Sequence, residues 1–67
     1  MEMIYEYELT KSEQEVLKLL TNGFSNRRIA SELCVNECTV KAHVGHILKK
    51  MNVENRVQAA VKAIKKL

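Results

Sequence analysis

Apolar residues recur at helical spacing in four short segments of the chain, and a side chain that favours helix N-termini precedes each segment. Proline is absent, and the only glycines are Gly23, directly after the first segment, and Gly45 within the third. The pattern predicts helices at about 11–21, 26–33, 37–51 and 55–66, and therefore an all-α domain. The expected N-caps are Thr10, Ser25, Asn36 and, for the last helix, Asn55 or Glu54.

Each predicted helix has one apolar stripe that we expect to face a shared core. In the last helix these residues are expected to be Val57, Ala60, Val61 and Ile64. Glu13 lies beside the stripe of the first helix, where an unpaired carboxylate is costly. Two roles stay open for it: a local capping box with Thr10, or an ion pair with Arg56 that fixes the last helix against the first.

The length of 67 residues limits the chain to one domain, which we place at 9–67 behind an acidic lead-in at 1–8. A core this small leaves no enclosed cavity for catalysis, so we expect neither an enzyme nor a cofactor. No apolar run approaches the ~20 residues of a membrane span, and we expect no membrane partner. Cys34 and Cys38 are typical of free thiols in a reducing cytoplasm, where we place the protein.

Charge is distributed unevenly along the chain. Residues 1–15 hold five Glu and one Lys, a net charge of −4, whereas residues 16–67 hold ten Lys or Arg and three Glu, a net charge of +7. No acidic residue lies between Cys38 and Val53. A basic stretch of this kind favours a polyanionic partner, although a solvated lysine-rich surface would have the same composition.

The second and third predicted helices are joined by a turn of about three residues, which is the arrangement of a DNA-binding helix-turn-helix, here at about 25–44. In that motif the later helix, 37–51, enters the major groove of double-stranded DNA. Its side opposite Val40 and Ile47 has small residues in the middle and lysines at the edges. On this side we expect base contacts from Lys41, Ala42 and Gly45.

Contacts to the DNA backbone are expected from groups that surround this side, including the amino end of the second helix. The candidates are Ser25, Asn26, Arg27, Thr39, His46, Lys49 and Lys50. For Gly45 two alternatives stay open, namely that it makes room for a close helix contact inside the domain, or that it reflects sequence drift without a structural role.

Several motifs with matching spacing resemble the LuxR-type helix-turn-helix of the NarL/FixJ/GerE group. They are Leu9-Thr10 with Glu13-x-Glu15-Val16-Leu17, Gly23-x-Ser25-Asn26-Arg27-x-Ile29-Ala30-x-x-Leu33, Thr39-Val40-Lys41-x-His43-x-x-x-Ile47 and Lys50-Met51-x-Val53-x-x-Arg56. The resemblance implies a four-helix DNA-binding domain of a bacterial transcription regulator, often located behind a receiver or ligand-sensing domain. It also implies a homodimer formed through the last helix, and RNA polymerase as a further candidate partner.

The alternative function is a small helical interaction module that does not read DNA. Small residues on the last helix would permit the close approach of a second copy, and the expected dimer interface is Ala59, Lys62, Ala63 and Lys66. A zinc site built from Cys34, Cys38, His43 and His46 is not expected, because His43 flanks the core side of its helix while Cys38 points outward.

Overall fold

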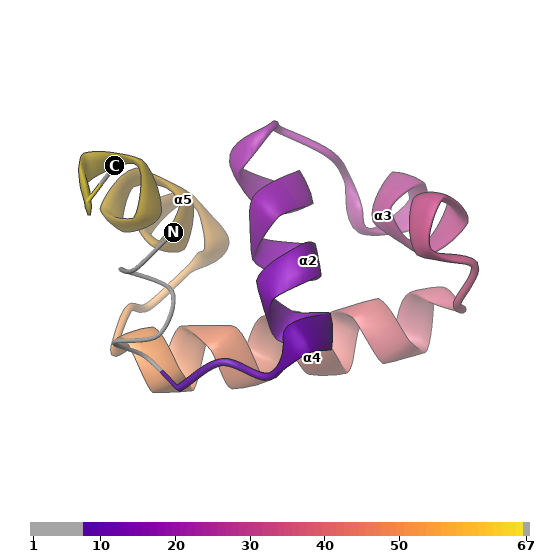
Figure 1. Ribbon diagram of the computed structural model, residues 1–67, viewed down its shortest axis with the longest axis horizontal. Coiled ribbons are helices and arrows are strands. Elements are labelled where there is room, and N and C mark those ends of the chain that lie inside the picture. Colours follow the sequence, from indigo (N-terminus) through magenta and orange to yellow (C-terminus); the bar gives the residue numbers. More distant parts are fainter. Residues whose placement is uncertain (1–7, 67) are drawn as a thin grey trace.

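The computed structural model describes residues 8–66, which form four helices: α2 (Lys11–Thr21), α3 (Asn26–Leu33), α4 (Glu37–Met51) and α5 (Arg56–Lys66). In Figure 1 the long helix α4 runs along the bottom, with α3 above one end, α5 above the other and α2 between them. The expected all-α class is confirmed, and residues 8–66 contain no strand. The first three helices have the expected bounds, and the last begins at Arg56 instead of 55.

Side chains cap each helix at the residue that the sequence indicates. Thr10 and Glu13 form a reciprocal capping box at the start of α2, Ser25 Oγ accepts from Arg28 N at 3.2 Å, and Asn36 Oδ1 accepts from Thr39 N at 2.9 Å. For α5, Asn55 Oδ1 accepts a hydrogen bond from Gln58 N at 2.9 Å. These caps satisfy backbone N–H groups that a helix leaves unpaired in its first turn, so they fix where each helix begins.

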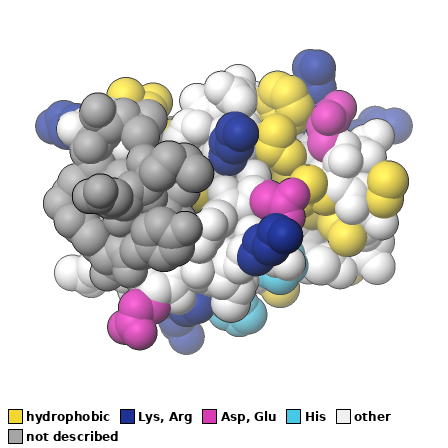
Figure 2. All heavy atoms as spheres, in the orientation of Figure 1, with side chains coloured by type: hydrophobic (Ala, Val, Ile, Leu, Met, Phe, Trp, Pro, Cys, Tyr) yellow, Lys and Arg dark blue, Asp and Glu magenta, His cyan; other side chains and the backbone are white. Residues whose placement is uncertain are grey.

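The core lies between α4 and the three helices above it. Its fully buried members include Val16 and Leu17 of α2, Ile29 of α3, and Val40 and Ile47 of α4. Basic and acidic side chains lie next to one another on the face shown in Figure 2, without a broad patch of one sign. None of the described helices combines the length and the apolar character that crossing a bilayer requires.

The predicted inward face of α5 was wrong for three of its four residues, and only Ala60 packs partly buried against the core. Ala59 and Ala63 are fully buried, whereas Val57, Val61 and Ile64 are exposed by 67%, 46% and 53%. Hydrophobicity favours valine and isoleucine for the core, but α5 packs closely on α2 and α4, and alanine is the side chain that allows this approach. Because Ala59 and Ala63 are used inside the domain, they cannot form the predicted dimer interface.

Glu13 carries the strongest charged contact between α2 and α4. Its side chain is almost fully buried, and Oε1 accepts hydrogen bonds from Thr10 N at 2.9 Å and Lys50 Nζ at 2.7 Å. Burial raises the pKa of Glu13, but the hydrogen bonds from Lys50 and Thr10 outweigh it, so its pKa lies below the ordinary value of 4.5. The carboxylate therefore stays ionised and holds α4 against the start of α2.

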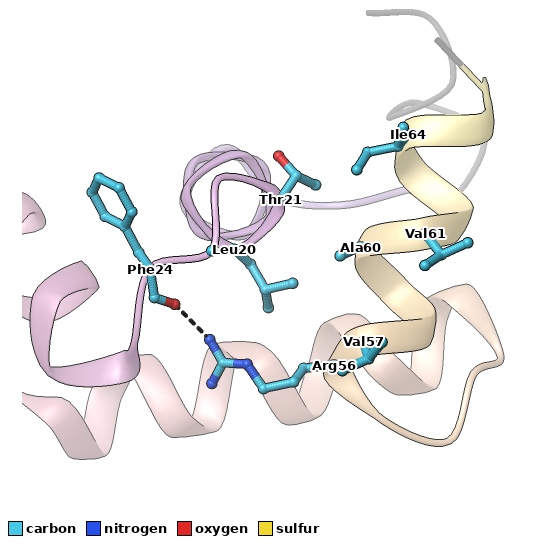
Figure 3. A pocket seen from close by; sticks show the side chains of 9 residues that line it. Leu20, Thr21, Phe24, Arg56, Val57, Ala60, Val61 and Ile64 are labelled. Atoms are coloured by element: carbon cyan, nitrogen blue, oxygen red, sulfur yellow. Dashed lines mark hydrogen bonds between the residues drawn. The ribbon is translucent and has the colours of Figure 1, made fainter.

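Of the two roles left open for Glu13, the capping box with Thr10 is present and the ion pair with Arg56 is not formed. Arg56 instead donates to Asn26 Oδ1 at 2.5 Å. It also donates to the carbonyl oxygen of Phe24 at 2.8 Å, the bond drawn in Figure 3. The length of α2 keeps the two side chains apart, because Glu13 lies in the first turn of α2 while Arg56 reaches the segment that follows its last turn. Arg56 therefore joins the start of α5 to the start of α3.

We predict that Lys50→Ala lowers the free energy of unfolding at pH 7 by about 1–3 kcal/mol, because a buried carboxylate loses its charged hydrogen-bond donor. Because the pKa of Glu13 is lower in the folded than in the unfolded state, its carboxylate stabilises the fold at every pH above the unfolded-state pKa. This stability is lost as the pH falls through the folded-state pKa. Without Lys50 the pKa of Glu13 rises toward its unfolded-state value, so less stability is lost as the pH falls, and the difference in unfolding free energy between wild type and variant becomes smaller at low pH. Urea unfolding from about pH 7 to about pH 3 measures both effects.

The matched control is Lys49→Ala, which removes an exposed neighbouring lysine that makes no hydrogen bond or ion pair with the described residues. It should leave the unfolding free energy within about 0.5 kcal/mol of the wild-type value. Equal unfolding curves for the two variants at every pH would contradict the role given to Lys50.

Candidate nucleic-acid interface

A short turn of three residues, 34–36, separates α3 from α4. Cys34 adopts the left-handed conformation with φ 57°, and Val35 N donates to the carbonyl oxygen of Ala30 at 3.0 Å, which closes the end of α3. Asn36 then caps α4. Helix, turn and helix thus follow one another without any loose segment, and the turn fixes the direction in which α4 leaves α3.

The two sides of α4 differ as the sequence predicts. Val40, Val44, Ile47 and Met51 are buried, while Cys38, Lys41, Ala42, Gly45 and Lys49 are exposed. All three residues predicted to contact bases, Lys41, Ala42 and Gly45, are therefore accessible together on the outer side of one helix. The helix can present this side to a partner without disturbing the core.

Gly45 is not required by packing within the domain. A Cβ atom added at this position would meet nothing within 4 Å outside its own helix backbone. The alternative that Gly45 makes room for a close helix contact is thus wrong for the part of the chain that the structure describes. The glycine leaves the outer side of α4 thin at its middle, at a cost in helix stability of roughly 1 kcal/mol relative to alanine.

Two of the residues predicted to contact the DNA backbone are exposed and have no partner among the described residues. These are Arg27, in the first turn of α3, and Lys49, near the end of α4. Both can accept an anionic partner without breaking an existing bond. The neighbouring Arg28 lies over the ring of Phe24, with 4.3 Å from its Cζ atom to the ring centroid.

The other predicted backbone contacts have roles within the domain. Ser25 and Thr39 take part in helix caps, since Ser25 Oγ accepts from Arg28 N and Thr39 Oγ1 donates to Asn36 Oδ1 at 3.0 Å. Asn26 accepts from Arg56. His46 and Lys50 both face Glu13, with His46 Nδ1 3.7 Å from Glu13 Oε2.

Sequence reasoning missed an exposed apolar stripe on α5. Val57, Val61 and Ile64 line a groove of about 300 Å³ together with Leu20 and Phe24 (Figure 3). The signal that could have revealed it is the four-residue spacing of Ala59 and Ala63, which places two small side chains on one face. Of the other predicted dimer residues, Lys62 donates to the carbonyl oxygen of Met51 at 2.9 Å, and the side chain of Lys66 lies outside the described part of the chain.

Comparison with known proteins identifies the family. Residues 7–63 match the family described as bacterial regulatory proteins, luxR family. The chain is 56% identical over 57 residues to the transcriptional regulatory protein DegU of Brevibacillus brevis, which covers 85% of this chain and 24% of DegU. It is 50% identical over 54 residues to the nitrate/nitrite response regulator protein NarL of Escherichia coli K12, covering 81% of this chain and 25% of NarL.

A third relative, the glycerol metabolism activator of Pseudomonas putida, is 53% identical over 55 residues, which cover 82% of this chain and 25% of the activator. The chain thus spans about a quarter of the length of these relatives. The family match covers more than three of the four helices. The chain belongs to the luxR family of bacterial regulatory proteins.

Proposed function

We propose that this chain is the double-stranded-DNA-binding domain of a bacterial transcription regulator, with α4 as the helix that enters the major groove. The observation that carries the proposal is the outer side of α4, which is exposed, small at Ala42 and Gly45, and basic at Lys41 and Lys49. Family membership supports it, as do relatives whose names are those of transcriptional and response regulators.

Dimensions favour this placement. A helix with its side chains is about 10–12 Å across, and the major groove is about 12 Å wide, so a side of small residues allows the backbone to approach base edges. Lys41 can then donate to guanine O6 or N7, and Ala42 can contact a thymine methyl group. Lys49 on this side of α4 and Arg27 in the first turn of α3 are exposed and have no partner among the described residues, so we expect them to contact phosphates.

A second copy of the chain is proposed to pack on the exposed stripe of α5, Val57, Val61 and Ile64. Helix-turn-helix proteins that bind as dimers place two recognition helices about 34 Å apart in successive major grooves. An apolar stripe on the outer side of one helix is self-complementary under two-fold symmetry, so it can form such an interface. This stripe replaces the predicted interface, whose alanines are buried.

The regulatory setting is also a proposal. Because the chain spans about a quarter of relatives named as response regulators, we propose that it acts within a longer cytoplasmic regulator and contributes to the recruitment or exclusion of RNA polymerase. The alternative, an interaction module that does not read DNA, is favoured only by the exposed stripe of α5. The two functions differ in the salt dependence of binding to DNA.

We predict that the wild-type chain binds duplex DNA with an affinity that falls steeply as salt is added, because phosphate contacts release counterions. Lys49→Ala should weaken binding to every duplex and reduce the salt slope by about one unit. Fluorescence anisotropy at several salt concentrations measures both quantities.

Lys18→Ala provides the control for this measurement. Lys18 is an exposed lysine of α2, which packs on the opposite, buried side of α4, so its removal should leave the slope unchanged. Self-association of the chain with no binding to duplex DNA at low salt would favour the interaction module and contradict the proposal.

We predict that Gly45→Leu reduces affinity for duplex DNA by at least about tenfold, or 1.4 kcal/mol. Position 45 is exposed and an added Cβ atom there meets nothing within 4 Å outside its own helix backbone, so the fold should tolerate leucine, which is the better helix former by roughly 0.8–1 kcal/mol. Thermal unfolding should therefore show equal or higher stability in the same variant that binds DNA poorly.

The comparison variant is Ser12→Leu, which adds the same side chain at an exposed position of α2. It should bind DNA as the wild type does. If Gly45→Leu also retained wild-type affinity, the outer side of α4 would not approach the groove as proposed.

We predict that Val61→Lys abolishes cooperative binding of two copies to DNA fragments that the wild-type chain selects from a random pool. Its charge would have to be buried in the interface of the dimer. Gel-shift titration separates the one-copy and two-copy complexes. Val35→Lys, which alters an exposed valine of the turn, should keep the cooperativity. If Val61→Lys also kept it, the α5 interface would be excluded.

A further inference from the structure

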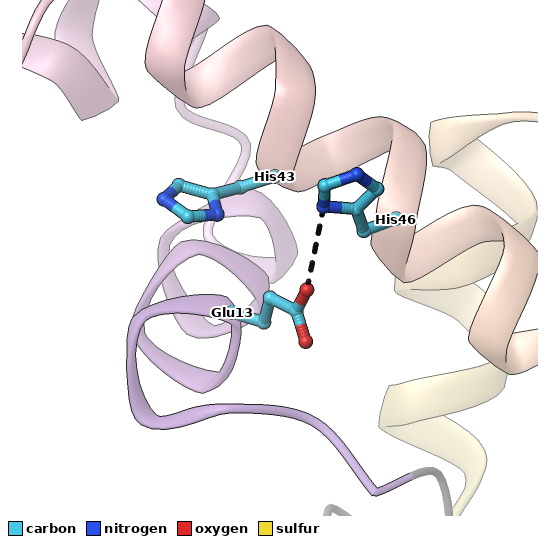
Figure 4. A group of neighbouring side chains, drawn as sticks. All are labelled: Glu13, His43 and His46. Carbon is cyan, nitrogen blue, oxygen red and sulfur yellow. Dashed lines mark ion pairs between the residues drawn. The ribbon is translucent and has the colours of Figure 1, made fainter.

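Three side chains capable of binding a metal ion gather where α2 crosses α4. Glu13 comes from the first turn of α2, and His43 and His46 come from adjacent turns of α4, with both rings directed toward α2 (Figure 4). One ligand atom from each residue lies within 4.8 Å of the other two. Residues three apart on a helix are neighbours on one face, so the two imidazoles approach the carboxylate together.

The two oxygens of Glu13 have different surroundings. Oε1 accepts from Thr10 N and from Lys50 Nζ. Oε2 receives no hydrogen bond from the described residues, and His46 Nδ1 lies 3.7 Å from it. The hydrogen bonds to Oε1 therefore orient the carboxylate with its second oxygen directed at the imidazoles, while Lys50 does not occupy this oxygen.

His43 supplies an independent observation. Its Nδ1 atom is buried and has no hydrogen-bond partner in the described part of the chain. Buried polar atoms are nearly always paired, so this nitrogen calls for a partner that the protein itself does not provide. A metal ion bound by the ring would be such a partner.

We propose that Glu13, His43 and His46 form a binding site for a divalent transition-metal ion of the zinc type. Bonds of about 2.0–2.2 Å in a tetrahedral zinc site place neighbouring ligand atoms about 3.3–3.6 Å apart. The 3.7 Å between Glu13 Oε2 and His46 Nδ1 is already close to this spacing. Two imidazoles and one carboxylate suit zinc, and a water molecule would complete the tetrahedron.

One ligand of the site is buried and held in place, and another is exposed, so an ion can reach the site. Glu13 is buried and oriented, His43 is half-buried, and the side chain of His46 is 63% exposed. His46 can therefore rotate by the small amount that closes the site, and the ion has an open path to it. The bound ion would join α2 to α4 through two turns of the helix proposed to enter DNA.

The sequence alone did not indicate this site. In the sequence, the residue types that suit a metal are Cys34, Cys38, His43 and His46, but both cysteines are exposed free thiols outside the cluster. Glu13 lies about thirty residues before the histidines, so no local spacing pattern connects them. The zinc proposal does not depend on DNA binding and can be tested without DNA.

Isothermal titration with Zn²⁺ at neutral pH tests the site in the wild-type chain, in His46→Asn, and in the double variant Cys34→Ser, Cys38→Ser. We expect one ion per wild-type chain, the same affinity in the double cysteine variant, and at least tenfold weaker binding in His46→Asn. His46 is exposed, so its replacement leaves the fold intact. Saturating Zn²⁺ should also raise the melting temperature of the wild type by several degrees, and raise that of His46→Asn less.

NMR of the imidazole rings provides a second readout. The ring signals of both His43 and His46 should shift with the same titration curve as one equivalent of Zn²⁺ is added. The proposal is overturned if the wild type binds no Zn²⁺, if the cysteine variant loses the binding, or if the signals of only one histidine respond.

Discussion

Two hydrogen bonds accepted by Glu13 Oε1 join the start of α2 to α4, and the positions of the core and of the outer side of α4 depend on this connection. One, from Thr10 N, completes the cap that starts α2, and the other, from Lys50 Nζ, holds α4 against it. Burying an unpaired carboxylate raises the free energy of the folded state, so the fold favours the position of α4 relative to α2 in which Lys50 pairs with Glu13. The outward side of α4 is thereby fixed as well, because its inward side has no freedom to rotate.

Helix α4 has to satisfy two demands with one sequence of fifteen residues. Its inner positions carry Val40, Val44 and Ile47 for the core, and its outer positions carry small and basic residues. The mid-helix glycine is unfavourable for an isolated helix, but tertiary packing of the inner side compensates for this. The inner side of α4 thus contributes to the core, and packing within the domain does not constrain the residues on its outer side.

Much of the fold could be predicted from local sequence, because helix bounds depend on nearby groups. Thr10, Ser25 and Asn36 cap helices through contacts three residues away, which the spacing reveals. The buried face of α5 and the partners of Glu13 and Arg56 depend on how distant segments pack. Hydrophobicity alone predicts the wrong face of α5, because alanine allows closer helix packing than valine. For the site, exposure of Lys41, Ala42 and Gly45 was predictable from helical periodicity, whereas the internal roles of Asn26, His46 and Lys50 were not.

Arg56 joins two regions for which different partners are proposed. Its guanidinium group bonds to Phe24 and Asn26 at the entrance of α3, and the backbone of the same residue opens the helix that carries the exposed stripe. Together with the packing of α5 on α2 and α4, these hydrogen bonds fix the offset between the two regions. In a pair of domains joined through α5, the tertiary structure would therefore hold the N-terminal ends of the two α3 helices at a constant distance.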